Sequence, residues 1–266
     1  LMPFKKSATK QGHTSKFSKS TEVAQPGYYA VTLDDDNIKV ELTTSKRAGM
    51  HKYIFESEND NLVYLDLDHR DKVIQSNLTI EDEYTVSGFR ISEAWAKEQH
   101  VYFVAQFSEK MSDLGGTKGH TNTFGFNSKE VLVKIGISAV SIEGARKNLE
   151  AEIPQWDFNK VKTETQQAWE SELSKISIEA TNEQKEIFYT ALYHSLLNPN
   201  LFSDIDGKYR GTDLQIHQSD KNIYTVFSLW YTYRATHPLF TIIEQEKTNE
   251  FINTFLLQYE NGGQLP

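Results

Sequence analysis

The chain has 266 residues, 28 Lys and Arg against 37 Asp and Glu, and a formal net charge of −9. An acidic chain with no long basic run argues against nucleic acids and anionic membranes as partners, and no apolar run approaches the roughly 20 residues of a membrane span. It has no cysteine, which excludes disulfides, thiolate metal sites and a cysteine nucleophile.

The first part of the chain is predicted to form strands. Residues 1–25 are rich in Ser, Thr, Lys and Gln and are expected to form an exposed loop. Residues 27–33 and 38–43 alternate between apolar and polar side chains around an Asp-rich turn, which predicts a hairpin. Further strands are predicted at 51–55, 62–67, 73–80, 85–91, 101–107 and 131–137. Short strands separated by turn signals about every ten residues are typical of a β-sandwich.

The period of the pattern changes at Ser141, and helices are predicted from there on. Ser141, Asp157 and Thr181 are expected to cap three helices, the first of which ends at Pro154. Residues 200–224 are expected to be mostly loop with a short hairpin at 202–210, followed by helices at about 226–235 and 247–259. Strands followed by helices indicate two separate domains.

The segment 188–238 combines aromatic rings with carboxylates, guanidinium groups and imidazoles. Rings stack on the apolar face of a pyranose, while charged groups bind its hydroxyls, so this composition is typical of a sugar-binding cleft or its wall. The candidate substrate-binding residues are Trp230, Tyr231, Arg234, Asp204, Asp206, Arg210, Asp213 and His237. For each of them a structural role is the competing interpretation, such as a core ring, a turn or an ion pair.

An ordered series of short motifs runs through most of the chain: PGYY at 26–29, VSGFR at 86–90, HVYF at 100–103, KIGIS at 134–138, FYTALYH at 188–194, FSDIDG at 202–207 and YTVFSLW at 224–230. In this order the motifs resemble glycoside hydrolase family 92, the calcium-dependent exo-acting α-mannosidases. The resemblance implies a β-sandwich of the galactose-mutarotase-like supersandwich type at 1–140, linker helices at 141–178, and the first helices of an (α/α)6 barrel at 179–266.

The resemblance also implies a mannose-containing glycan as the substrate, calcium as the cofactor, and export to the periplasm or cell surface. Members of the family invert configuration with one carboxyl as acid and another as base. Both are expected beyond Pro266, as are most calcium ligands, so no catalytic residue or metal ligand is assigned here. We expect the chain to be an internal fragment that is inactive alone and needs the remainder of its catalytic domain.

At the mannose pocket, the family's Ser-Leu-Trp-Asp-Thr motif is matched by Ser228, Leu229, Trp230 and Thr232, but Tyr231 replaces the Asp. Losing that carboxylate would remove a charge-assisted hydrogen bond worth about 1.5–3 kcal/mol. Two other functions therefore stay open, namely a carbohydrate-binding β-sandwich protein without hydrolytic activity and a structural interaction domain.

Overall fold

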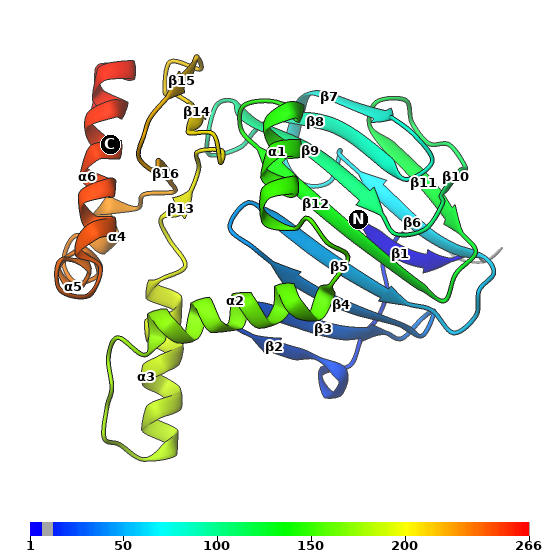
Figure 1. Ribbon diagram of the computed structural model, residues 1–266, viewed down its shortest axis with the longest axis horizontal. Coiled ribbons are helices and arrows are strands. Elements are labelled where there is room, and N and C mark those ends of the chain that lie inside the picture. Colours follow the sequence, from blue (N-terminus) through cyan, green and yellow to red (C-terminus); the bar gives the residue numbers. More distant parts are fainter. Residues whose placement is uncertain (7–12, 266) are drawn as a thin grey trace. The chain divides into compact units, whose positions relative to one another are not determined.

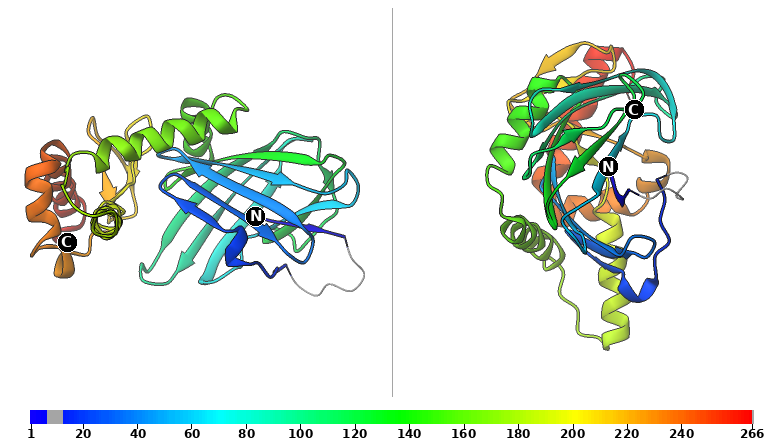
Figure 2. Two further views of the ribbon diagram at one scale, coloured as in Figure 1. Left: turned by 90° about the horizontal axis from the view of Figure 1, so that it is seen from below. Right: turned by 90° about the vertical axis from the view of Figure 1, so that its right-hand side faces the viewer.

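The computed structural model describes residues 1–6 and 13–265 and divides the chain into two compact units, Leu1–Gln166 and Gln167–Pro266. The first unit is a sandwich of two antiparallel sheets (Figures 1 and 2). The large sheet has the order β2-β3-β4-β5-β12-β9-β8-β7 and the small sheet the order β1-β6-β11-β10. The strands are β1 Met2–Lys5, β2 Val23–Gln25, β3 Tyr28–Leu33, β4 Ile38–Thr44, β5 Ala48–Ile54, β6 Asn61–Asp66, β7 Lys72–Ile80, β8 Thr85–Glu93, β9 Gln99–Phe107, β10 Ser112–Asp113, β11 Thr121–Phe126 and β12 Glu130–Ser138.

Alternation along the strands decides which side chains enter the core. In β9, Phe103, Ala105 and Phe107 point between the two sheets, whereas Val104 belongs to a second cluster on the opposite face of the large sheet. Helix α1 (Ile142–Glu152) covers that second face with Ala145 and Leu149. The large sheet is therefore buried on both faces in this region, and its central strands read as nearly continuous apolar runs.

A glycine lets α1 approach the sheet closely. A Cβ atom at Gly136 of β12 would lie 2.2 Å from the Ala145 carbonyl oxygen and 2.7 Å from the Leu149 Cβ atom. Only a residue without a side chain fits at this distance, because both neighbours are parts of a packed helix.

The prediction of an exposed loop at residues 1–25 is wrong for part of this segment. β1 pairs with β6, β2 pairs with β3, and a 3₁₀ turn forms at Lys19–Thr21. Residues 7–12 of the predicted loop lie outside the described residues. Both strands lie at the edges of their sheets, and the three residues of β2 are exposed, so their sequences carry little apolar alternation.

The helices that follow begin where the capping residues predict. Ser141 accepts the Gly144 amide at the start of α1, and Asp157 accepts the Lys160 amide at the start of α2 (Phe158–Leu173). Thr181 and Gln184 form a reciprocal capping box at the start of α3 (Asn182–Ser195). The boundary between the two compact units falls within α2.

The second unit continues with short strands and three more helices. The strands are β13 Asn200–Leu201, β14 Lys208–Arg210, β15 Ile216–Gln218 and β16 Tyr224–Thr225, and the helices are α4 Leu229–Thr232, α5 Thr236–Ile243 and α6 Gln245–Gly262. Among the described residues, no helix is long and apolar enough to cross a membrane. The predicted fold class, an antiparallel β-sandwich followed by helices, is confirmed.

Two local predictions in the second unit are wrong. The hairpin lies at β14 and β15, not at 202–210, because the turn from Asp204 to Gly207 precedes β14 rather than closing the hairpin. The predicted helix at 226–235 is a single turn, α4, and a second helix, α5, begins at Thr236. His237 therefore lies in the first turn of α5 and not at the end of a helix.

Candidate functional site

Helix α6 organises the part of the second unit that carries the candidate residues. Its Phe251 ring packs against Tyr224 of β16, with ring centroids 4.8 Å apart, and against the buried Phe240 of α5. Its Glu250 carboxylate accepts a hydrogen bond of 2.6 Å from the Tyr224 hydroxyl. These contacts connect α6 to β16 and to α5 within this unit.

Asp204 and Asp206 lie in the turn before β14. Asp204 is 3% exposed, and its backbone closes the turn through the Lys208 carbonyl (2.8 Å) and the Gly207 amide (2.9 Å). Asp206 is half-buried, and its Oδ2 lies 3.4 Å from the Lys208 ammonium. Gly207 has a φ of +81°, a conformation that glycine adopts at low cost. Backbone hydrogen bonds of Asp204 thus close this turn, and burial makes Asp204 a poor direct contact for a ligand.

Arg210 and Asp213 lie in the β14–β15 hairpin. The Arg210 guanidinium donates to the Leu214 carbonyl at 2.8 Å, and both Asp213 carboxylate oxygens lie 3.0 Å from His217 Nε2. Partial desolvation raises the pKa of Asp213, but hydrogen bonds from the Gln215 amide and the His217 ring outweigh it and hold the pKa below its ordinary value. Asp213 is therefore ionised at neutral pH, and its carboxylate already has the His217 ring as a partner within this hairpin.

Trp230 and Tyr231 lie in the short helix α4, and Arg234 follows it in the chain. Trp230 is 84% exposed and Tyr231 is 78% exposed, which leaves both ring faces open. The exposed Arg234 donates from Nε to the Tyr233 hydroxyl at 2.7 Å and lies over that ring. Open rings beside a guanidinium group can stack on a pyranose and bind its hydroxyls, so this group fits the predicted chemistry best.

His237 lies apart from α4, in the aromatic core of the second unit. Its ring packs edge-on against Phe240 and Phe251, with centroid distances of 6.0 and 6.2 Å. Burial lowers the pKa of His237, which keeps the imidazole neutral at neutral pH. A neutral, half-buried ring in an aromatic core is the expected result of packing.

The eight predicted residues thus form local groups on the turn at 204–207, the β14–β15 hairpin, the α4 turn and the start of α5. Several of their hydrogen bonds join residues of the same group, such as Arg210 to Leu214, Asp213 to His217 and Arg234 to Tyr233. Among the residues that the structure describes, no group of three or more His, Cys, Asp or Glu side chains could hold a metal ion. The chemistry available here is recognition by rings and charged groups, and the described residues do not fit calcium as a ligand set.

The sequence-based search missed Trp95, which lies in the loop between β8 and β9 and is 95% exposed. The sequence around it is Ser-Glu-Ala-Trp-Ala-Lys-Glu-Gln, a single aromatic ring in an otherwise polar or small-residue turn between two strands. That pattern is the signal that could have identified it as an exposed ring, because a polar turn between two strands offers a tryptophan no alternating core position.

Comparisons with known proteins agree over both units. Residues 1–139 match the model of the glycosyl hydrolase family 92 N-terminal domain, and residues 144–266 match the model of the family's catalytic domain. A family GH92 α-mannosidase from Bacteroides thetaiotaomicron is similar in structure with a TM-score of 0.89 and 35% sequence identity, over 96% of this chain and 38% of that chain. The same enzyme has also been solved in complex with mannoimidazole.

Two more distant relatives also match this chain. A family GH92 inverting mannosidase from Bacteroides thetaiotaomicron VPI-5482 has a TM-score of 0.89 at 24% identity, over 100% of this chain and 39% of that chain. An uncharacterized secreted glycosidase from Arthroderma benhamiae is 25% identical over 219 residues, which are 66% of this chain and 28% of the relative. The chain thus spans well under half the length of these relatives.

Proposed function

The chain belongs to glycosyl hydrolase family 92, and we propose that it contributes the β-sandwich and part of the substrate site to an exo-acting α-mannosidase. The observation that carries this proposal is the 35% identity to an α-mannosidase over 96% of the chain. The two family models together extend over both units, and the catalytic-domain model includes the ring-rich segment around α4. The substrate would be a glycan that carries terminal α-linked mannose.

In this proposal the chain binds substrate and does not perform the chemical step. An inverting glycosidase needs one carboxyl group to protonate the leaving oxygen and a second to activate water across the ring. We assign neither role to a residue of this chain, and we propose that the chain by itself is inactive. Calcium, if the complete enzyme uses it, would be held mostly by residues outside this chain, and we route no step through it.

The residues at α4 would contact the sugar. Trp230 presents an open ring face that can stack on a pyranose, and the Arg234 guanidinium can donate hydrogen bonds to hydroxyls. Tyr231 presents a phenol where family members carry a carboxylate. A phenol forms a weaker, neutral hydrogen bond, so this member would bind mannose less tightly or prefer a different substituent on the sugar.

The test is an assay of the complete protein on α-linked mannobiose, with and without a chelator. Release of mannose that stops with the chelator supports both the activity and the calcium requirement. Release that continues with the chelator supports the activity alone. If neither condition yields mannose, the proposal is refuted. Replacing Trp230 by Ala in the complete protein should raise KM, with Trp169→Ala as a matched control because Trp169 packs on Tyr193 within the second unit.

A second candidate function is carbohydrate binding without hydrolysis. Tyr231 favours it, because a carboxylate lost from the mannose pocket is a change expected in an inactive relative. Calorimetry with mannose and α-mannobiose separates the two functions. Sugar binding by the complete protein without any product after long incubation would favour the binding function over the enzyme. The similarity to a secreted glycosidase supports the further proposal that the complete protein is exported.

A further inference from the structure

Strand β7 forms one edge of the large sheet, and its sequence lacks the usual protection of an edge strand. Residues 73–80 contain no charged side chain and no proline. Ile74 and Ile80 are 51% and 37% exposed. Proteins commonly place a charge or a proline on such a strand, because its unpaired backbone groups otherwise pair with another chain. An uncharged edge strand of nine residues therefore needs another form of protection.

The register with β8 shows which backbone groups of β7 face the open edge. The Glu81 amide donates to the Thr85 carbonyl at 2.9 Å, and pairs along an antiparallel ladder alternate between bonded and non-bonded ones. The non-bonded positions of β7 are therefore Ser76, Leu78 and Ile80. Their amides and carbonyls point away from β8. Among the strands of the described residues, β8 is the neighbour of β7 in the sheet, and the other side of β7 is open.

The loop 114–120, which precedes β11, reaches this open edge at Ser76. The Ser76 hydroxyl donates to the Gly119 carbonyl at 2.9 Å. A Cβ atom at Gly119 would lie 3.5 Å from the outward Ser76 carbonyl oxygen, and the φ of Gly119 is +79°. Glycine adopts this conformation at low cost and brings the two backbones close together. We call the loop 114–120 the strap, because it occupies the place where a pairing strand would bind Ser76.

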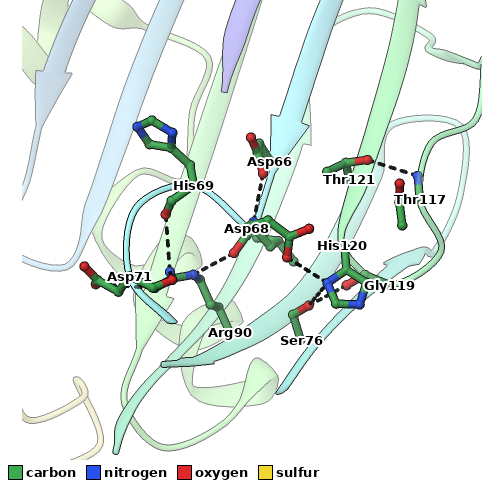
Figure 3. A network of polar contacts seen from close by, with 11 residues as sticks. Asp66, Asp68, His69, Asp71, Ser76, Arg90, Thr117, Gly119, His120 and Thr121 are labelled. Atoms are coloured by element: carbon green, nitrogen blue, oxygen red, sulfur yellow. Dashed lines mark hydrogen bonds and ion pairs between the residues drawn. The ribbon is translucent and has the colours of Figure 1, made fainter. Parts of the chain in front are cut away.

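His120 fastens the strap (Figure 3). Its Nδ1 lies 2.7 Å from the Asp68 carboxylate and 3.1 Å from the Ser76 hydroxyl. Its backbone carbonyl accepts the Leu67 amide at 2.9 Å, and its amide donates to the Thr117 carbonyl within the strap at 2.9 Å. One residue thus ties the strap both to β7 and to the loop 67–71.

Arg90 of β8 holds the loop to which the strap is fastened (Figure 3). Its guanidinium donates to the carbonyls of Leu67 (2.6 Å), Asp71 (3.1 Å) and His69 (3.2 Å). The Arg90 side chain is 18% exposed, so these bonds are largely protected from competing water. The strap is therefore anchored to a loop that is itself fixed against the sheet.

The strap and a β-bulge together leave only a short part of the edge clear. The bulge lies between Val73 and Gln75, and a bulge ends regular pairing along an edge strand. With the strap in place, only residues 77–80 are clear of both, which is shorter than an ordinary strand of about 5–6 residues. With the strap released, the clear part extends from 75 to 80 and reaches that ordinary length.

A second copy of β7 fits this edge. Two antiparallel copies of one strand form a contact that a two-fold axis closes. Bonded pairs join residues whose backbone groups point outward, so the register that uses all of them places Leu78 opposite Leu78 and Ser76 opposite Ile80. Asn77 then lies opposite Thr79, and no charged side chain between 73 and 80 opposes the contact.

We propose that the strap closes the edge of β7 against a second copy of the chain, and that release of the strap lets two copies pair through this edge. The interaction surface is the outward backbone of residues 75–80. Its protection is carried by the close approach of Gly119 and by the bonds of Ser76 and His120. The proposal is independent of the proposed function, because no sugar contact enters it.

The test is sedimentation velocity of the complete protein over a concentration range of about 1–100 μM. The released variant carries Ser76→Ala and His120→Ala, and at the highest concentration its mass should be about twice that of the wild type. Ser128→Ala is the matched control, because it removes a hydroxyl that donates to the Glu130 carbonyl at 2.9 Å, in the loop before β12. It should sediment as the wild type does.

A second pair of substitutions shows whether β7 is the surface that associates. Asn77→Lys with Thr79→Lys, added to the released variant, places lysines opposite each other in the proposed register and should restore the wild-type mass. Association that survives these lysines overturns the proposal.

Hydrogen exchange in the peptide 114–120 reports whether the strap has opened. Faster exchange there without any rise in mass overturns the proposal, and so does unchanged exchange, because the named bonds then do not hold the strap. If the double variant fails to fold, Ser76→Ala alone, which removes one hydroxyl, is judged by the same two criteria.

Discussion

Glu152 at the end of α1 provides the sharpest test of how the first unit holds its helix. Its carboxylate accepts hydrogen bonds from the Arg47 guanidinium (2.8 Å), the Arg47 amide (2.7 Å) and the Ser45 hydroxyl (2.6 Å). The Arg47 and Glu152 side chains are 10% and 11% exposed. The carboxylate lies near the negative end of the helix dipole, so these bonds and not the helix itself favour its position.

We expect Glu152→Ala to destabilise the packing of α1 strongly. The substitution leaves the Arg47 guanidinium and the Ser45 hydroxyl without this partner in a nearly buried place. Breaking a buried pair from one side costs about 3–5 kcal/mol, and we take the lower figure because some water reaches the pair. A loss of about 3 kcal/mol corresponds to a roughly hundredfold faster amide exchange wherever exchange requires α1 to open.

Hydrogen exchange read by mass spectrometry on the complete protein measures this opening directly. Peptides covering α1 should exchange about a hundredfold faster in Glu152→Ala, while peptides from β7 should be unchanged. Glu143→Ala is the matched control, since Glu143 lies in the same helix, is 66% exposed and has only a 3.9 Å contact with Arg146. If the Glu152 variant changes exchange in α1 by less than threefold, the buried pair does not hold the helix.

Four further results are expected. Burial lowers the pKa of His51 to about 4 from an ordinary value of 6.5, so the folded state favours the neutral ring and the wild type loses stability as the pH falls from 6.5 towards 4. Over that range the free energy of unfolding of His51→Gln should fall by about 3 kcal/mol less than that of the wild type. Burial also lowers the pKa of Lys134 below its ordinary value of 10.5, because desolvation outweighs the attraction of the Glu150 charge. Between the lowered pKa and pH 10.5, the free energy of unfolding of the wild type should therefore rise with pH relative to that of Lys134→Met. If the difference in denaturant midpoint between the two proteins does not change with pH, this reasoning is wrong. Gly136→Ala should cost about 1–3 kcal/mol and speed exchange in α1, because the new methyl group would overlap that helix; wild-type exchange would show that α1 adjusts freely. Tyr231→Asp should tighten mannose binding by one to two decades in calorimetry, and an unchanged Kd would mean that position 231 does not face the sugar.

Much of the local structure could be predicted from the sequence, because it depends on neighbours along the chain. Alternation of Ile38, Val40 and Leu42 predicts a strand with one buried face, and the structure places all three side chains against the sandwich core. Thr181 and Gln184 predict the start of α3, since a capping box needs only residues three apart. The change from strands to helices near Ser141 could be predicted for the same reason, because it depends on local periodicity.

Prediction failed where a segment takes its structure from distant partners. The short edge strands β1 and β2 form because β6 and β3 offer unpaired backbone groups. In β11, Phe124 and Phe126 enter the core on alternate positions, but the first half of the strand, Thr-Asn-Thr, is polar and hides the pattern. The break between α4 and α5 depends on packing of Phe240 against α6, which the sequence around Trp230 does not indicate.

The sequence by itself thus determined the two-part fold, the capped helices and the ring-rich segment around Trp230, since composition and short-range periodicity carry that information. Only the tertiary structure decided which loops meet. Trp95, Arg90 and His120 come from a hairpin tip, a strand and a loop that are spread along the sequence. They share one end of the sandwich because strand order and register across two sheets bring them there, and no local pattern encodes that pairing.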